Sequence, residues 1–164
     1  LGALAQMGRL DASDLLRALT DPAAAVRARG CQLAAGLLGS RSDQLLIGRL
    51  RVALTDPDPL VVEAACFALG EGDSHDATRE IAAVATGHRD PRCRESAVAA
   101  LGSLGDPEGM AAVLQALTDK PSVRRRAVVA LAGFDGPEVE PALSACLADR
   151  DWQVRDAARR LLTP

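Results

Sequence analysis

The hydrophobic and polar positions of this chain recur with the period of an α-helix, most clearly in residues 56–70. The apolar residues of this stretch have the i, i+4, i+7, i+8 spacing that buries one face of a helix: Val61, Ala65, Ala68 and Leu69. An Asp at the beginning of this stretch can accept hydrogen bonds from the free N–H groups of the first turn, and the Pro after it stands where a missing N–H costs nothing. Gly70 follows the last apolar position, where a left-handed glycine can end a helix. The pattern predicts one amphipathic helix with its own start and stop signals.

The same pattern returns along the whole sequence. Its first apolar position, the anchor, occurs in five copies at intervals of 35, 32, 30 and 31 residues: Val26, Val61, Cys93, Val123 and Val154. Four residues after each anchor stands a small residue that lets neighbouring helices approach closely: Gly30, Ala65, Ala97, Ala127 and Ala158. A helical repeat of about 20 to 50 residues is typical of a solenoid, in which each unit buries its apolar face against the next.

A second helix is predicted before each start signal. We call the helices that contain the anchors the start-signal helices, and the helices that precede them in the chain the partner helices. Three partner helices end in a Leu-Thr-Asp step, at residues 19–21, 54–56 and 117–119. We expect an all-α protein, an α-solenoid of antiparallel helix pairs that forms a single domain over residues 1–164. Its expected units are a partial repeat at 1–20 and repeats that begin near residues 21, 56, 88, 119 and 149.

The repeated residues resemble a known family. Asp-Pro-x-x-x-Val-Arg, followed by Ala and then by Ala-Leu-Gly, is similar to the short HEAT repeats of the phycobilisome-lyase type. Residues 21–27 carry the first half of this motif and residues 100–102 the last. The resemblance covers essentially the whole chain and implies a superhelical, armadillo-like stack. Similar repeats occur in proteins that attach or detach bilin chromophores on phycobiliproteins, so the resemblance also implies a lyase-like alternative for the function.

Composition narrows the function classes. The chain has 164 residues, of which 48% are hydrophobic and 2% aromatic, so we expect a core of aliphatic and small side chains. A formal net charge of −3 and a pI near 5.4 give no overall attraction to nucleic acid or to an anionic membrane. No apolar run reaches the length of about 18 residues that a membrane span needs. Leu1–Met7 lacks the basic segment of a secretion signal and resembles the end of a helix. Because Leu1-Gly2 matches the phase of Leu101-Gly102, we expect a fragment of a longer solenoid, or a processed or trimmed chain.

The four cysteines stand where small apolar residues belong. Cys31 and Cys66 share a repeat position, so stacking would separate their Cα atoms by about 10 Å. A disulfide needs a separation of less than about 7 Å. Cys93 replaces an anchor Val, and Cys146 lies on a partner helix. We therefore expect buried, reduced thiols and a cytoplasmic protein.

An Arg follows the anchor in four of the five copies, with Val62 as the exception: Arg27, Arg94, Arg124 and Arg155. One hypothesis is that these residues line an anion-binding ridge. The other is that each one reaches a carboxylate of a repeat loop and ties neighbouring units together, the candidates being Asp21, Asp56, Asp119 and Asp149. We favour the second hypothesis, because the Arg recurs with the fold itself.

The two histidines lie in separate clusters. One cluster has the residue types of a nucleophilic site: His88, Asp90 and Cys93. The other has those of a metal site: Asp73, His75 and Asp76. A predicted helix of about ten residues separates the two histidines by roughly 15 Å, and neither cluster supplies a base, an orienting group and an oxyanion site together. We expect no catalytic residue, no metal site and no cofactor.

The C-terminal third is locally basic because of the run Arg124–Arg126 and several further arginines. Acidic neighbours largely offset this charge, and base stacking has almost no aromatic residues to use. We expect ion-paired helix faces, and nucleic-acid backbone binding stays a second alternative function. The last start-signal helix has Arg159 and Arg160 where earlier copies are mostly apolar, which is typical of a terminal cap.

The function that these observations favour is non-catalytic binding of a protein partner on an extended scaffold surface. We expect the partner helices to line that surface, with four exposed positions inferred from helical phase: Arg17, Arg49, Glu80 and Gln115. Because the sequence offers few Trp, Tyr or Phe anchors, we expect a modest affinity or a site that continues in further repeats. We expect neither a nucleic-acid partner nor a membrane.

Overall fold

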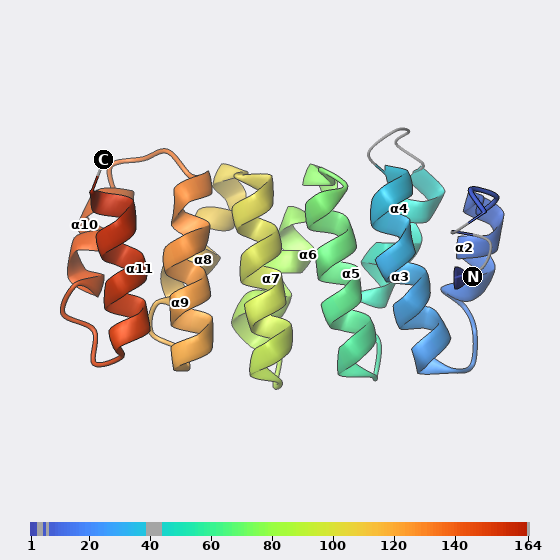
Figure 1. Ribbon diagram of the computed structural model, residues 1–164, viewed down its shortest axis with the longest axis horizontal. Coiled ribbons are helices and arrows are strands. Elements are labelled where there is room, and N and C mark those ends of the chain that lie inside the picture. Colours follow the sequence, from blue (N-terminus) through green and yellow to red (C-terminus); the bar gives the residue numbers. More distant parts are fainter. Residues whose placement is uncertain (3–4, 6, 39–43, 164) are drawn as a thin grey trace.

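The computed structural model describes residues 1–2, 5, 7–38 and 44–163 and arranges them as two layers of helices stacked in chain order (Figure 1). The start-signal layer contains α3 (Ala24–Leu38), α5 (Pro59–Glu71), α7 (Pro91–Leu104), α9 (Pro121–Ala130) and α11 (Trp152–Leu162). The partner layer contains α2 (Ala12–Ala18), α4 (Gln44–Ala53), α6 (Thr78–Gly87), α8 (Met110–Ala116) and α10 (Val139–Cys146). Three short 3-10 helices accompany them: η1 (His75–Ala77), η2 (Pro107–Gly109) and η3 (Leu131–Gly133). Parts of the predicted partial repeat at 1–20, namely residues 3–4 and 6, lie outside the described residues.

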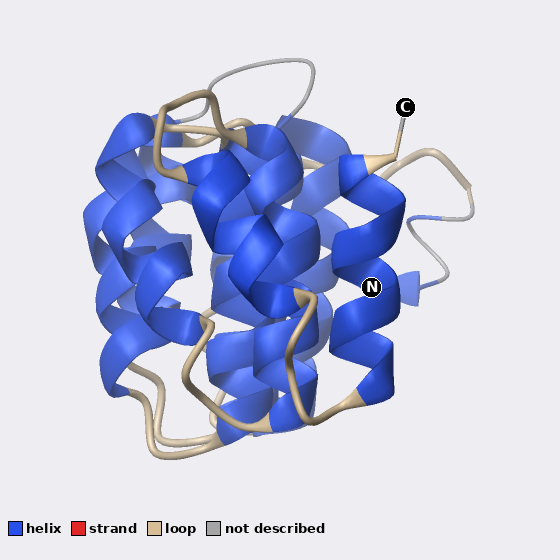
Figure 2. Cartoon of the chain, turned by 90° about the vertical axis from the view of Figure 1, so that its left-hand side faces the viewer, coloured by secondary structure: helices blue, strands red, loops and turns tan. Residues whose placement is uncertain are grey.

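The described residues contain no strand, and the end-on view in Figure 2 shows helices joined by loops. Each start-signal helix packs against the next one along the chain, from α3 through α5, α7 and α9 to α11. The expectation of an α-solenoid built from helix pairs is therefore confirmed. No helix in the described part of the chain is both long enough and apolar enough to cross a membrane.

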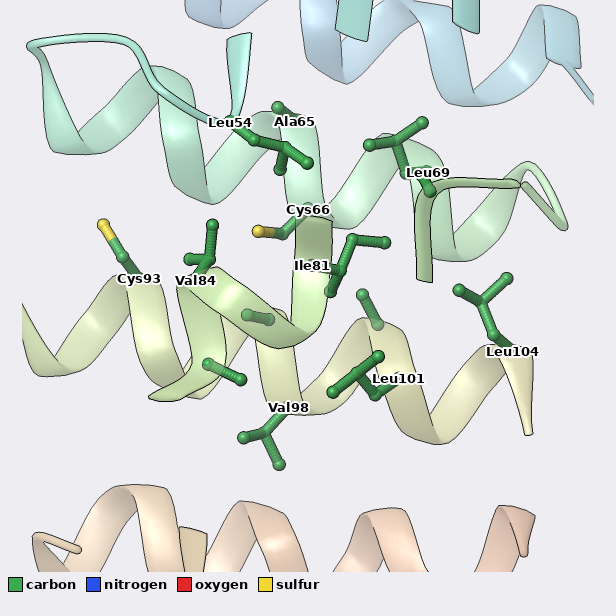
Figure 3. Packing of buried hydrophobic residues seen from close by; sticks show 14 of the residues in the cluster. Leu54, Ala65, Cys66, Leu69, Ile81, Val84, Cys93, Val98, Leu101 and Leu104 are labelled. Carbon is green, nitrogen blue, oxygen red and sulfur yellow. The ribbon is translucent and has the colours of Figure 1, made fainter. Parts of the chain in front are cut away.

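One continuous hydrophobic cluster runs through the stack. Four of the five anchors are fully buried and Val26 is partly buried. Figure 3 shows the side chains of Cys66, Ile81 and Leu101, which come from α5, α6 and α7, within this shared core. Phe134 is the single aromatic side chain among the described residues of the cluster. The core is thus aliphatic, as the composition predicts.

The start signal of α5 lies in the stretch Asp-Pro-Asp-Pro, residues 56–59. An Asp caps the helix with a Pro directly after it, as predicted, and it is the second Asp of the stretch: Asp58 is the N-cap of α5, its carboxylate accepts the N–H of Leu60 at 2.9 Å, and Pro59 is the first helical residue. Asp56 instead accepts the N–H of Asp58 at 2.9 Å and shapes the turn. Of two successive Asp-Pro steps, the second begins the helix, and its Pro has the φ that a first turn requires.

The glycine of the Ala-Leu-Gly step does not end the helix, so the prediction about Gly70 is wrong. Gly70 lies inside α5, where a Cβ would be 2.8 Å from the Cα of Ala100 on α7. At Gly102, within α7, a Cβ would be 2.7 Å from the Cα of Ala130 on α9. Gly105 supplies the left-handed end of α7, with φ of 60°. Gly70 and Gly102 therefore set the spacing between neighbouring start-signal helices.

Candidate partner-binding surface

Three bidentate Arg–Asp pairs join neighbouring units: Arg27 with Asp56, Arg94 with Asp119, and Arg124 with Asp149. In each pair the Nε and Nη2 groups of the Arg donate to the two carboxylate oxygens over 2.6–2.9 Å. The hydrogen bonds from each Arg hold the pKa of its Asp below the ordinary value. Arg155 donates instead to the backbone carbonyls of Asp149 and Arg150. The hypothesis that these arginines tie units together is confirmed for the three pairs.

The contact between α5 and α7 lacks such a pair. Val62, which is fully buried, stands where the other units have Arg, and His88 stands where they have Asp. His88 keeps part of the role of that Asp, because its Nδ1 accepts the N–H of Asp90 at 3.1 Å, just as Asp56 accepts the N–H of Asp58. A neutral imidazole that accepts through Nδ1 carries its proton on Nε2. The turn geometry is thus kept while the charge pair between the units is absent.

The cysteines are placed for packing rather than for nucleophilic chemistry. The thiol of Cys93 donates to the carbonyl of Pro59 at 3.4 Å, and burial raises the pKa of this thiol to about 11. Burial likewise raises the pKa of Cys31 to about 12, and it raises the pKa values of Cys66 and Cys146. All four are buried and free, as predicted. A covered, protonated thiol has little nucleophilic character.

His75 lies between the turns of two neighbouring units. Its Nε2 is 3.0 Å from Asp73 Oδ1 and its Nδ1 is 3.4 Å from Asp106 Oδ2. The hydroxyl of Thr78 also donates to Asp106, at 3.2 Å. Of the two carboxylates predicted beside His75, Asp73 is in place, and Asp106 of the next unit stands in for Asp76. No group of three or more His, Cys, Asp or Glu side chains able to hold a metal ion is found among the described residues.

The four predicted partner-binding residues lie on four helices of the partner layer, α2, α4, α6 and α8: Arg17, Arg49, Glu80 and Gln115. Glu80 is half-buried and the other three are exposed. Two of the four are engaged within the protein, because Arg17 pairs with Asp14 and Glu80 pairs with Arg51. Their role in binding a partner stays a prediction.

A hollow of about 740 Å³ lies on the opposite layer, across α5, α7 and α9. Phe67 of α5 and Val129 of α9 line it and are 51% and 49% exposed. The rest of its apolar lining consists of small residues: Gly70, Ala99, Ala100, Gly102, Ala130, Ala132 and Gly133. Two large apolar side chains therefore flank a surface on which another chain can approach the helix backbones closely.

The repeat pattern does not single out Phe67 and Val129 as surface residues. Both fall six residues after their anchors, at a phase outside the buried i, i+4, i+7, i+8 stripe. The equivalent residue of α7 is Ala99 and that of α11 is Arg160. A large apolar residue at a solvent-facing phase was the signal that could have found them.

Two further hollows continue this surface along the layer. One, of about 710 Å³ over α3 and α5, shares Glu63, Phe67 and Ser96 with the first hollow. The other, of about 320 Å³ over α9 and α11, shares Val129 and includes Trp152, which is 65% exposed. We call the three hollows together the start-signal groove. It crosses all five start-signal helices.

Charged side chains line the groove. The Oε1 atom of Glu63 is buried without a hydrogen-bond partner, and its nearest cation is the Nε of Arg92 at 3.8 Å. Burial raises the pKa of Glu63. Glu95 lies 3.6 Å from Arg126 across the contact between α7 and α9. Arg124, by contrast, is buried in its pair with Asp149, so the basic run of α9 is only partly available to a partner.

Comparison with known proteins identifies the repeat. The sequence pattern of HEAT repeats matches residues 49–122 and 110–163. The fold is similar to a chain in the complex of CpcE and CpcF of phycocyanin lyase from Nostoc sp. PCC7120, with 19% identity and a TM-score of 0.78 over 92% of this chain and 63% of that chain. It is also similar to a designed armadillo repeat protein in complex with the peptide (KR)4, with 17% identity and a TM-score of 0.66 over 98% of this chain and 83% of that chain. No curated protein matches the sequence.

Proposed function

Because this chain belongs to the HEAT-repeat family, we propose that it is a non-catalytic scaffold module that binds a protein partner in the start-signal groove. The observation that carries the proposal is the hollow flanked by Phe67 and Val129. Both side chains are about half exposed although the rest of their helices is packed against neighbours. Large apolar side chains next to a hollow are typical of partner-binding surfaces.

The similar solved structures support a binding role by analogy. The designed armadillo protein is in complex with a peptide, and a further similar chain comes from the Pds5–Scc1 complex, with 15% identity and a TM-score of 0.65 over 89% of this chain and 27% of that chain. At these identities the likeness shows a common fold alone. The proposal for this chain therefore rests on its own exposed side chains and on the hollow between them.

The test begins with a partner captured by cross-linking from an extract of the source organism, which is then purified for titration calorimetry. We expect Phe67→Ser and Val129→Ser each to weaken binding by about 5- to 50-fold, since an apolar interface side chain is worth about 1–2 kcal/mol or more. Val52→Ser is the matched control, because Val52 is 65% exposed on α4 of the partner layer. Arg49→Glu tests the predicted site on that same layer. Loss of binding in Arg49→Glu with no change in Phe67→Ser would move the site to the partner helices.

A bilin lyase-like activity is the second candidate, favoured by the likeness to the phycocyanin lyase chain, of which this chain spans 63% of the length. The test mixes the protein with a bilin and an acceptor phycobiliprotein and follows the visible absorption spectrum. A new absorption band that needs this protein would establish the lyase role. An unchanged spectrum would leave the scaffold as the single candidate.

A further inference from the structure

The start-signal groove has two halves of opposite charge. The lining residues from α5 and α7 include three glutamates and one arginine: Glu63, Glu71, Glu95 and Arg92. The lining residues from α9 and α11 include three arginines and one aspartate: Arg125, Arg126, Arg160 and Asp156. The lining of α5 and α7 therefore carries a net negative charge and that of α9 and α11 a net positive charge, while α3 adds one cation, Arg29, at the end of the groove beyond α5. A partner that matches this surface needs the opposite gradient.

The acidic half is incompletely neutralised within the protein. Among the described residues, the arginine paired with Glu63 is Arg92, at 3.8 Å, and Arg92 is also held by Asp90 through its Nη2 at 3.3 Å. Glu71 is exposed and forms no ion pair with any described residue. A cationic side chain placed over α5 and α7 would supply the positive charge that these carboxylates lack.

The basic half combines charge with an aromatic side chain. Arg125 and Arg160 line the hollow over α9 and α11 together with Trp152. Arg160 is 79% exposed in its side chain although it pairs with Asp156 at 2.8 Å. An acidic side chain of a partner can therefore reach a guanidinium here while its neighbouring carbon atoms contact the indole ring.

The dimensions of the groove indicate the size of its occupant. Neighbouring helices lie about 8–10 Å apart, so the distance from α5 to α11, three spacings away, is roughly 30 Å. An extended chain covers about 3.3 Å per residue, so about nine residues span this distance. The small residues between Phe67 and Val129 leave room for an apolar side chain at the centre of such a segment.

We propose that the start-signal groove binds an extended partner segment of about nine residues that has basic side chains at one end, apolar side chains in the middle and acidic side chains at the other end. The basic end lies over α5, the apolar side chains lie over α7 between Phe67 and Val129, and the acidic end lies over α9 and α11. This inference rests on the proposed function and specifies the chemistry of its partner.

A surface with two oppositely charged halves is also complementary to itself under two-fold symmetry, so a second copy of this chain is the competing occupant. Shape favours the segment. Two copies face to face would place hollow opposite hollow and leave the space beside Phe67 and Val129 unfilled, whereas a single extended chain fills it.

The test uses two fluorescently labelled nine-residue peptides with the same composition of three Lys, three Leu and three Asp. In one peptide the residues are grouped in blocks of Lys, Leu and Asp, and in the other the charges alternate. Binding is measured by fluorescence anisotropy at low salt, and sedimentation of the unlabelled protein is measured at the same concentrations. We expect the block peptide to bind at least 5-fold more tightly than the alternating peptide, and added salt to reduce this preference.

Charge reversal locates the two ends of the segment. Glu71→Lys and Arg125→Glu should each lower the preference for the block peptide by about 3-fold or more, because each reverses a charge at one end of the groove. Glu140→Lys is the matched control, since Glu140 is exposed on α10 of the partner layer.

Equal affinity for the two peptides would overturn the inference on the partner, and a captured partner that still depends on Phe67 would then leave the proposed function intact. A dimer that the block peptide dissociates would overturn it in favour of a second copy. Binding of the block peptide that Phe67→Ser leaves unchanged would overturn both the inference and the groove itself.

Discussion

The contact between α7 and α9 and the contact between α5 and α7 share one packing device and differ in their charges. In both, a glycine lies against an alanine of the next helix: Gly102 against Ala130 and Gly70 against Ala100. The α7–α9 contact adds the Arg94–Asp119 pair, whereas the α5–α7 contact has Val62 and His88 at the equivalent positions. Since both contacts keep the same helix spacing device, backbone packing sets the geometry of the stack. The ion pairs add stability and pH dependence to it.

Removal of the ion pair should have the largest effect. Arg94→Ala leaves Asp119 partly buried without its partner and also removes a 2.7 Å hydrogen bond to the carbonyl of His88. We expect the free energy of unfolding to fall by about 2–4 kcal/mol, measured by urea denaturation. Arg160→Ala is the control, because its pair with Asp156 is exposed and should be worth less than about 1 kcal/mol. Equal small losses in both variants would show that the buried pair adds nothing to the α7–α9 contact.

Disruption of the shared packing should affect both contacts alike. Gly102→Ala and Gly70→Ala each place a Cβ less than 3 Å from backbone and Cβ atoms of the next helix. We expect each to lower the free energy of unfolding by about 1–3 kcal/mol. Gly48→Ala on α4 is the control: nothing lies within 4 Å of its Cβ, so the better helix propensity of Ala should stabilise the protein by about 0.5–1 kcal/mol. A stabilised Gly70→Ala would show that the α5–α7 contact is loosely packed.

Installation of the missing pair should make the two contacts more alike. Val62→Arg alone buries a charge without a partner and should destabilise the protein. His88→Asp in the same chain supplies that partner, so the double variant should recover about 1 kcal/mol or more of the loss in a double-mutant cycle. The two single variants measured by thermal denaturation complete the cycle. Additive effects of the two substitutions would mean that the two units joined by the α5–α7 contact are oriented differently from the other units.

The two contacts should respond to pH in opposite directions. The Arg94 guanidinium lowers the pKa of Asp119 from its ordinary value of 3.8, so the stability it gives is complete above that value and is lost as the pH falls through the lower folded-state pKa. Burial raises the pKa of Glu63 from 4.5, so the folded state holds its proton more tightly and stability declines as the pH rises through the raised pKa.

Glu63→Gln should abolish the decline in stability that occurs as the pH rises. It should leave the loss of stability at acid pH unchanged. Arg94→Ala should make the loss of stability at acid pH smaller, since the pKa of Asp119 is then nearer its ordinary value. Both effects are read from the free energy of unfolding measured between about pH 2 and pH 8. A decline toward neutral pH that persists in Glu63→Gln would assign it to another group.

The sequence predicted most of the fold because one small set of contacts is repeated. The anchors and the small residues four positions later recur at each copy, and the Arg–Asp ties recur at three contacts, so an error in one copy is corrected by the others. The local details were harder. Asp56 and Asp58 each precede a proline, and sequence alone does not show which Asp accepts the first helical N–H. Gly70 was interpreted as a helix end because its contact with Ala100 lies 30 residues further along the chain.

The candidate surface was predictable only in part. Helical phase placed Arg17, Arg49 and Gln115 at exposed positions, as the structure has them. The groove depends on something that phase alone does not give: large apolar residues at Phe67 and Val129 with the small Ala99 between them on three neighbouring helices. The charge gradient likewise becomes visible only when α5, α7, α9 and α11 are placed side by side.

The glycine–alanine contacts have a consequence for any molecule that enters the groove. Because Gly70 and Gly102 hold the helices in contact at the level of the backbone, the spacing of the helices beneath the groove does not depend on side-chain rotamers. An incoming chain then meets a rigid, pre-organised site, and the entropic cost of association falls mainly on the chain that binds. Affinity for this protein should therefore improve most when the ligand, rather than the receptor, is made stiffer.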